Sequence, residues 1–363
     1  MKTLLLGDFC AKTEKVKPLF ANGDVEALFG DALEIFKGRD LIAVNLECAI
    51  TDSEEGITKH GPCLASPRGT ERMLQRLGVN LVGLSNNHVF DFGERGARDT
   101  LEALRSAGLA YTGFGMSYDD SRRSFILEKD GERVAVIAVC EHEYSYAKEN
   151  RMGARPFDEF DTIEDIRRAN AECDRVIVMY HGGKEHCRYP SPRLMRVCRA
   201  MVRAGADVVL CQHTHCISCY ENYEGGHILY GQGNTHFLGY INEECWLSSL
   251  AVEYDTATGE IGFIPLSNGE SAVELAKGEE RLNIERGFAE RSASLLDGSW
   301  INGWREFCDS KAKEYKTVVA RAGRSDSTEE EDLQFAHYLD CEAHLDVFRE
   351  LFKTKHMTDF NYK

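Results

Sequence analysis

The sequence predicts an α/β fold, built on a mixed sheet or a two-sheet sandwich, with a helical appendage after it. Up to about residue 215, short apolar runs alternate with amphipathic, helix-like segments. Turn signals between β-rich runs then indicate antiparallel hairpins. After about residue 270 the strand signals stop, and charged, helix-favouring stretches follow. We therefore expect one domain over residues 1–269 and a helical appendage over residues 270–363.

The expected strands of the first part are apolar runs that end in polar or glycine residues. Their alternation with helical segments is typical of buried, partly parallel strands. The strands are expected at residues 3–8, 41–47, 79–87, 175–183 and 206–215. The helical segments are expected at residues 24–36, 69–78, 97–108 and 191–205. Hairpins are expected around Asp130-Gly131, around Gly225-Gly226 and at a turn that ends in Gly259.

Charge and cysteine usage restrict the class of protein. The formal net charge of −17 argues against a general nucleic-acid or anionic-membrane binder, which needs a basic face, but it allows a local positive pocket. The 13 cysteines are scattered, and many lie in apolar runs, which is typical of buried thiols in a reducing cytoplasm. No apolar run approaches the roughly 18 residues of a membrane span. We expect a cytoplasmic protein, and the sequence gives no indication of its oligomeric state.

Polar side chains follow the apolar runs at the points where the expected strands end. Ligands of an open α/β sheet bind beyond the carboxyl ends of its strands. Carboxylate, amide and imidazole donors in one place suit Zn²⁺, Mn²⁺ or Fe rather than a thiolate-rich structural zinc. A shared carboxylate can bridge two ions roughly 3.5–4 Å apart. The residues at these strand ends are Asp8, Glu47, Asn87, His88, His181, His213 and His215.

Several stretches together resemble a known family, the capsule-synthesis, poly-γ-glutamate-associated (CapA-type) proteins, which share the calcineurin-like metallophosphoesterase fold. The resemblance covers roughly residues 1–265 and leaves the helical appendage uncovered. The matching stretches are LLGDF at the start, VNLECAIT at 44–51, LSNNHVFDFGERG at 84–96, HGGKEH at 181–186, GADVVLCQHTH at 205–215 and ILYGQGN at 228–234.

The resemblance implies a four-layer sandwich of mixed sheets flanked by helices, with two divalent metal ions (Zn, Mn or Fe) at its edge. It implies that His88 is the general acid or stabilises the transition state, and that Asp91 orients His88. Cys10 stands where these enzymes commonly have a histidine ligand. Either its thiolate ligates a metal ion, or this metal position is weak or absent. The metal ligands implied by position are Asp8, Cys10, Glu47, Asn87, His181, His213 and His215.

Further polar residues near these motifs are candidates for binding a small anionic or polymer-derived substrate. They are Lys59, His60, His142, Glu185, His186 and Asn234.

Three functions remain open from the sequence. The favoured one is a metal-dependent hydrolase that acts on a phosphoester, or, less favoured, on a γ-glutamyl amide. The second is a biosynthetic accessory that acts on a γ-glutamyl or other anionic polymer, in the production of a capsule or a surface polysaccharide. The third is a non-catalytic binding or scaffold protein, whose helical appendage is an interaction surface. Stoichiometric metal separates the first function from the third.

Overall fold

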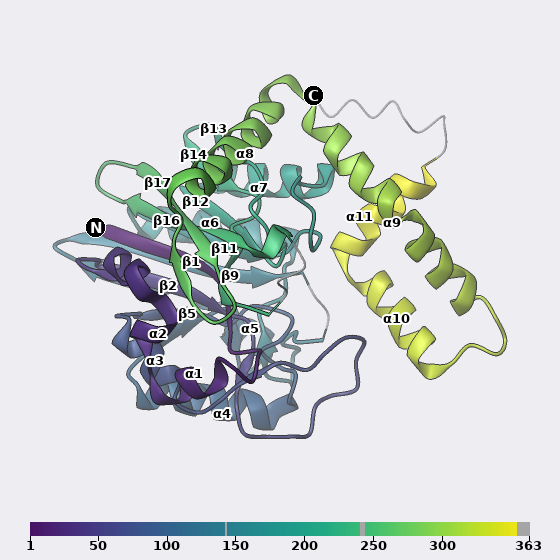
Figure 1. Cartoon of the computed structure of the whole chain (residues 1–363), viewed down its shortest axis with the longest axis horizontal. Helices are drawn as coiled ribbons and strands as arrows, with labels where there is room; N and C mark the ends of the chain where they lie inside the picture. The colour runs from purple at the N-terminus through teal and green to yellow at the C-terminus, as the bar shows by residue number, and fades with distance from the viewer. Residues whose placement is uncertain (142–143, 240–243, 354–363) are drawn as a thin grey trace.

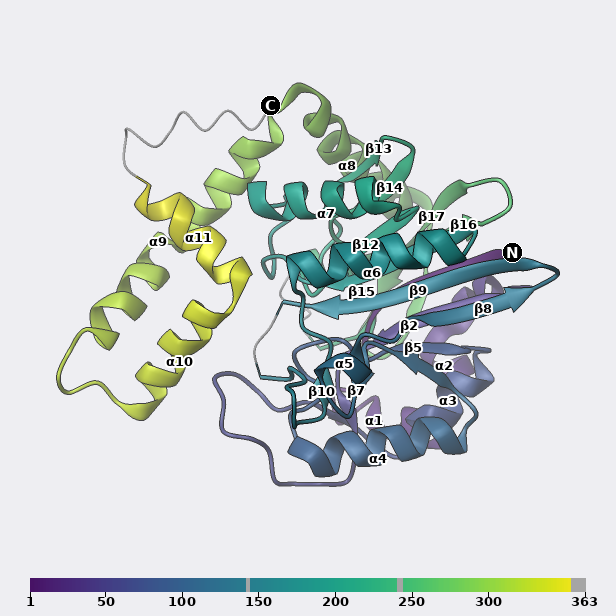
Figure 2. The ribbon, with the colours of Figure 1, turned by 180° about the vertical axis from the view of Figure 1, so that it is seen from behind.

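Two β-sheets lie face to face at the centre of the chain, and helices cover the outer face of each sheet (Figure 1). The computed structural model describes residues 1–141, 144–239 and 244–353. Seen from behind, α6 and α7 lie on one side of the strands, and α3 and α4 lie on the opposite side (Figure 2). The order is therefore helix, sheet, sheet, helix.

The first sheet has the strand order β18-β17-β16-β1-β2-β5-β6, and β15 also pairs with the end of β1. Strands β1, β2, β5, β6 and β15 pair in parallel. The pairs β1–β16, β16–β17 and β17–β18 are antiparallel. Its strands are β1 (Lys2–Cys10), β2 (Leu41–Leu46), β5 (Leu81–Gly83), β6 (Ala110–Thr112), β15 (Asn234–Phe237), β16 (Ser248–Asp255), β17 (Glu260–Asn268) and β18 (Val273–Leu275).

The second sheet has the order β13-β14-β12-β11-β9-β8, with parallel central strands and an antiparallel strand at each edge. The hairpins β8–β9, β13–β14 and β16–β17 confirm the three predicted turns. Its strands are β8 (Phe125–Lys129), β9 (Glu132–Cys140), β11 (Arg175–His181), β12 (Val208–Gln212), β13 (Tyr220–Tyr223) and β14 (Gly226–Leu229).

The helices of the sandwich occupy its outer layers. The expected helix over residues 24–36 is divided, because Gly30 has a φ of 45° that a right-handed helix does not allow. The helices are α1 (Lys17–Asn22), α2 (Val25–Phe29), the 3₁₀ helix η1 (Gly30–Phe36), α3 (Thr70–Arg76), α4 (Gly93–Ser106), α5 (Tyr118–Ser121), α6 (Glu159–Glu172), α7 (Pro192–Ala204) and the 3₁₀ helix η2 (Glu244–Trp246). Two further pairs of short strands lie outside these sheets. In one pair β3 (Ala49–Ile50) pairs with β4 (Ala65–Ser66), and in the other β7 (Phe114–Gly115) pairs with β10 (Gly153–Ala154).

Three apolar clusters separate the four layers. Successive side chains of a strand point to opposite faces of its sheet. In β1, Leu4 and Leu6 pack in the cluster beneath α1–α4, whereas Leu5 packs between the two sheets. In β11, Ile177 packs between the sheets, and Val178 packs in the cluster beneath α6 and α7. The predicted four-layer sandwich is thus confirmed.

A bulge in β1 changes the direction of the side chains near its end. The register with β2 passes from Leu6 opposite Val44 to Asp8 opposite Asn45, so Gly7 is an extra residue. A Cβ atom at Gly7 would lie 2.1 Å from the carbonyl oxygen of Gly233. Only glycine therefore allows the two backbones to approach this closely.

The helical unit, residues 278–352, follows the last strand and packs on the sandwich. The sheet continues beyond the predicted boundary at residue 269, because β18 pairs with β17. Trp300, Trp304 and Tyr315 of the unit belong to the same apolar cluster as α6 and α7. Thr328 and Glu331 form a capping box at the start of its third helix. Its helices are α8 (Gly278–Asp297), α9 (Trp300–Ala322), α10 (Glu329–Asp340) and α11 (Glu342–Phe352).

Two expectations about thiols and membranes concern the whole chain. All 13 cysteines lie within the described residues and are thiols rather than members of disulfide bonds, as the sequence predicted. Within the described ranges, none of the helices combines the length and the apolar character that a membrane crossing requires.

Replacing Gly7 with alanine tests the close approach at the bulge. We expect Gly7→Ala to lower the free energy of unfolding by about 1–3 kcal/mol, because the added methyl group overpacks a site walled by backbone. Urea unfolding measures it. Gly262→Ala in β17 is the matched control, since its nearest contact is the side chain of Glu253 at 3.4 Å. Equal losses in both variants would contradict the close approach.

Candidate metal centre

The predicted polar strand ends meet where the carboxyl ends of the parallel strands of both sheets come together. Asp8 lies near the end of β1, and Glu47 directly follows β2. His181 is the last residue of β11, and His213 and His215 follow β12. All of these residues are buried.

These side chains form two groups that share one carboxylate. One group is Asp8, Glu47 and His215, and the other is Glu47, His181 and His213. In each group, one potential ligand atom from every residue lies within 4.8 Å of the others. Glu47 belongs to both groups, and its Oε1 faces His181, His213 and His215 at 3.4, 4.0 and 3.9 Å.

The carboxylate of Glu47 is buried without a hydrogen-bond partner among the described residues, at both of its oxygens. Burial raises the pKa of Glu47, and the negative charge of Asp8 raises it further. A buried carboxylate without hydrogen bonds is costly unless a cation or a proton compensates for it. The donor set of carboxylate and imidazole groups fits Zn²⁺, Mn²⁺ or Fe, so the residues suit a bound divalent ion.

His181 lies between the two carboxylates. Its Nδ1 is 3.6 Å from Asp8 Oδ1, and its Nε2 is 3.4 Å from Glu47 Oε1. Burial alone would lower the pKa of His181, but Glu47 and Asp8 outweigh this effect and raise it to about 9. Burial likewise favours a higher pKa for Asp8, yet His181 and His215 bring that pKa below its usual value. The two carboxylates thus favour the protonated, positively charged form of His181.

The loop after β12 has an unusual backbone. His213 and His215 have φ values of 75° and 55°, in the left-handed region, which costs about 1–3 kcal/mol per residue. The backbone N–H of His213 donates to Asp8 Oδ2 at 2.9 Å, which ties this loop to β1. His215 Nδ1 lies 2.8 Å from Asn234 Oδ1, so its Nε2 is left to face Glu47 at 3.9 Å. Strain of this kind is retained where the surrounding contacts fix both rings.

Asparagines hold the remaining parts of the centre. Asn87 Oδ1 lies 2.9 Å from His181 Nε2, on the side of the second group. Asn45 donates to Asp8 Oδ1 at 2.7 Å. Asn86 accepts from the backbone N–H groups of His88 and Val89, which shapes the loop. Sequence reasoning missed Asn45 and Asn86, although a polar residue inside an apolar strand was a signal for the former.

The ring of His88 is held by the carboxylate of Asp91 and the ammonium group of Lys59. Its Nδ1 lies 2.6 Å from Asp91 Oδ2, and Lys59 bonds to the other oxygen of Asp91. Burial lowers the pKa of His88, and the charge of Lys59 lowers it further, against the effect of Asp91. The contact agrees with the orienting role that the resemblance implies for Asp91.

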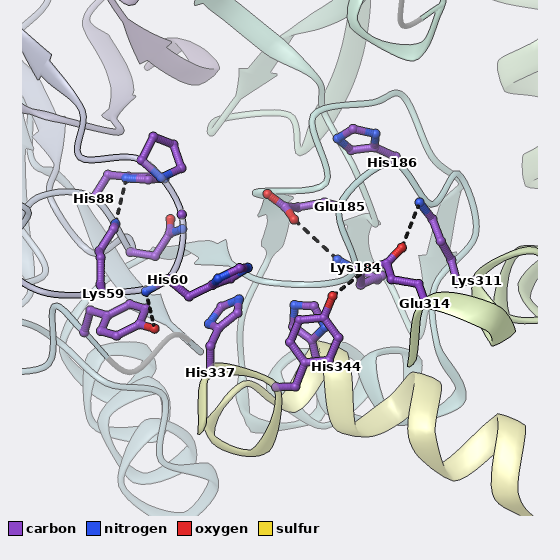
Figure 3. Close-up of a pocket in the computed structure, with 15 residues that line it drawn as sticks. Lys59, His60, His88, Lys184, Glu185, His186, Lys311, Glu314, His337 and His344 are labelled. Carbon is purple, nitrogen blue, oxygen red and sulfur yellow. Dashed lines mark hydrogen bonds and ion pairs between the residues drawn. The ribbon is translucent and has the colours of Figure 1, made fainter. Parts of the chain in front are cut away.

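A cavity of about 250 Å³ opens beside this histidine (Figure 3). The structure brings several sequence-predicted residues together on its wall: Lys59, His60, Asn87, His88, Glu185 and His186. Glu185 also forms a third group of potential ligands with His213 and His215. Lys184 and five residues of the helical unit line the same cavity, and sequence reasoning missed them.

Two candidates are placed elsewhere, and a third is not among the described residues. Asn234 lies behind His215 as its hydrogen-bond partner, not among the residues that line the cavity. Cys10 lies in the apolar cluster beneath α1–α4, outside the groups of potential ligands. Burial and the neighbouring Cys48 raise the pKa of its thiol. His142 lies outside the described residues.

Similarity to known proteins agrees with this geometry. Residues 2–238 match the family described as "Bacterial capsule synthesis protein PGA_cap". The chain belongs to this family. A capsule biosynthesis protein CapA of Bacillus anthracis is 28% identical over 216 residues, which cover 56% of this chain and 51% of that protein. The PGA biosynthesis protein CapA of Bacillus subtilis (strain 168) is 27% identical over 238 residues, which cover 64% and 61%.

The chain spans between about half and two thirds of the length of these curated PGA_cap relatives. Among solved structures, a putative 5′-nucleotidase from Staphylococcus aureus in complex with alpha-ketoglutarate is 12% identical, with 80% of this chain and 58% of that chain covered and a TM-score of 0.43. The match of residues 2–238 to the family confirms the resemblance seen in the motifs.

Removing the amide behind His215 tests whether it positions that ring. We expect Asn234→Ala to weaken Zn²⁺ affinity by about 10- to 100-fold, because the ring loses the hydrogen bond that fixes its orientation. Competition with a chromophoric chelator measures the affinity. Asn222→Ala, on the exposed part of β13, is the control and should match the wild type. Unchanged affinity in Asn234→Ala would show that His215 does not need this contact.

Proposed function

We propose that this PGA_cap protein is a metal-dependent hydrolase that binds two divalent ions and cleaves a phosphoester of a small anionic or polymer-derived substrate. One observation supports this most strongly. Glu47, a buried carboxylate that accepts no hydrogen bond from the part of the chain that the structure describes, is common to two groups of potential metal ligands. A shared carboxylate is what a two-metal hydrolase requires.

The two metal positions share Glu47 in this proposal. Asp8, Glu47 and His215 hold one ion, without Cys10, which lies in the apolar cluster. The second ion is held by Glu47, Asn87, His181 and His213. When bound, Zn²⁺, Mn²⁺ or Fe ions supply a water of lowered pKa and neutralise charge on the phosphoryl oxygens.

The other residues bind, orient and move protons. His88 lines the cavity, and it protonates the leaving oxygen or stabilises the charge that develops on it. Asp91 and Lys59 keep the ring of His88 in place through their contacts at its Nδ1 side. The negative charge of a bound phosphoester favours the protonated ring, which offsets the lowering of its pKa by burial and by Lys59.

The names of the relatives give a second candidate reaction. Capsule and PGA biosynthesis proteins serve the production of an anionic polymer, so a γ-glutamyl amide is an alternative substrate for the same residues. An accessory role in making such a polymer is compatible with either reaction. Parallel assays on a phosphoester and on a γ-glutamyl amide separate the two chemistries.

Metal content is the first test of the proposal. We expect protein purified without chelators to contain about two divalent ions per chain, and Asp8→Ala combined with His215→Ala to lower that number, because both ligands of one group are lost. Elemental analysis measures it. His227→Ala, at the start of β14, should keep the wild-type content. Wild-type protein that stays free of metal after incubation with Mn²⁺ or Zn²⁺ would support a scaffold instead.

Removing His88 tests the catalytic role of this residue. We expect His88→Ala to lower kcat for p-nitrophenyl phosphate by about 10²- to 10⁴-fold and to leave the metal content unchanged, because the ring handles a proton or charge and does not ligate. Hydrolysis of γ-glutamyl-p-nitroanilide is measured beside it, with His227→Ala as the control. Wild-type protein that carries metal but hydrolyses neither compound would refute the proposal, as would a fully active His88→Ala variant.

A further inference from the structure

The helical unit supplies one wall of the cavity that opens beside the metal centre. Figure 3 shows His337 and His344 across the cavity from His88. The other walls come from loops of the sandwich, which include Lys59 and Lys184. The wall residues of the helical unit are Lys311, Glu314, His337, Tyr338 and His344. They lie outside residues 2–238, the stretch that matches the family.

Ring contacts hold this wall against the sandwich. The ring of His337 lies 5.6 Å from that of His60 and is stacked on Tyr144 at 5.7 Å. Tyr338 is stacked on His344 at 3.9 Å, and its hydroxyl donates to Glu314 at 2.6 Å. The side chains of the wall are therefore oriented before any ligand binds, which lowers the entropic cost of binding.

A buried ionic network fixes the helical unit relative to the metal centre. Asp346 of α11 accepts from Arg193 of α7 at 3.0 Å, and Arg193 also donates to Glu141 at 2.6 Å. Glu141 in turn accepts from the backbone N–H of Gly183 at 2.6 Å, two residues after His181. Both carboxylates are buried, and breaking such a network leaves an uncompensated charge. The wall and the metal ligands thus keep a fixed distance.

The lining of the cavity concentrates basic side chains in a chain whose formal net charge is −17. Its lysines are Lys59, Lys184 and Lys311, and they are paired with the carboxylates of Asp91, Glu185 and Glu314, respectively. The formal charges of these pairs balance when the histidines are neutral. Of the 12 histidines, five also line this cavity, namely His60, His88, His186, His337 and His344. Cationic and imidazole donors concentrated in one cavity favour an anionic ligand.

We infer that the substrate carries a second anionic group, away from the bond that is cleaved, and that Lys311 and His337 of the helical unit bind this group. This inference rests on the proposed function, because the metal centre holds the first anionic group. The second group is a phosphate or a carboxylate, since both accept hydrogen bonds from ammonium and imidazole donors. The helical unit thereby selects for substrates with charge at both ends.

Unreactive phosphonates test this inference on the metal-loaded full chain. The probes are an alkylphosphonate, a phosphonocarboxylate and an alkyl bisphosphonate in matched chain lengths, and calorimetry measures their dissociation constants. We expect at least one doubly anionic probe to bind about tenfold tighter than the alkylphosphonate, as one charge-assisted contact provides. A larger gain in affinity for the phosphonocarboxylate identifies the second group as a carboxylate. A larger gain for the bisphosphonate identifies it as a phosphate.

Variants assign that gain to the helical unit. Lys311→Ala combined with His337→Ala should bring the ratio of two dissociation constants, that of the alkylphosphonate over that of the doubly anionic probe, close to one. Lys316→Ala, an exposed lysine on the same helix, should keep the wild-type ratio. A wild-type ratio near one at every chain length, or a ratio unchanged in the double variant, would overturn the inference. Metal-dependent binding of the alkylphosphonate in that case would leave the proposed function intact, whereas its absence would count against the proposed function itself.

Discussion

The structure depends on the burial of two carboxylates, Asp8 and Glu47, in one small space between two sheets. Like charges in a medium of low dielectric repel strongly, and each loses its hydration. Asp8 is compensated by Asn45, by the backbone of His213 and by neighbouring imidazoles. Glu47 also faces the imidazoles of His181 and His215, but it accepts no hydrogen bond among the described residues. This difference makes Glu47 suited to a bound cation.

The backbone is adapted to bring the donors around these carboxylates. Regular strands would alternate their side chains, but the bulge at Gly7 changes the direction of the end of β1. After β12, the left-handed conformations of His213 and His215 direct two imidazoles toward the same carboxylate. A bulged strand and one strained loop are consistent with ligands drawn from distant segments, because no regular element presents them in one place.

Much of this centre was predictable because its residues follow apolar runs, as Asp8 and His181 do. The supporting contacts were not, since no pattern distinguishes a hydrogen-bond partner such as Asn86 from an ordinary turn residue. A period of two along β1 would direct Cys10 the same way as Asp8, yet Cys10 lies in an apolar cluster. A second irregularity, between Asp8 and Phe9 in the pairing with β15, lies between the two residues. The helical unit was predicted as an element, but its place at the cavity depends on long-range packing that sequence periodicity does not encode.

In the proposed function, the sandwich and the helical unit have different roles. Metal ions supply a nucleophile and neutralise charge in the same way for many esters, so ligands alone select a substrate poorly. Selectivity requires contacts with parts of the substrate that do not react, and these contacts can also contribute to the rate. The potential ligands of this chain lie within residues 2–238, whereas Lys311 and His337 lie beyond them and line the same cavity. Because the network from Asp346 to Glu141 is buried, the helical unit can hold such contacts at a constant distance from the metal centre.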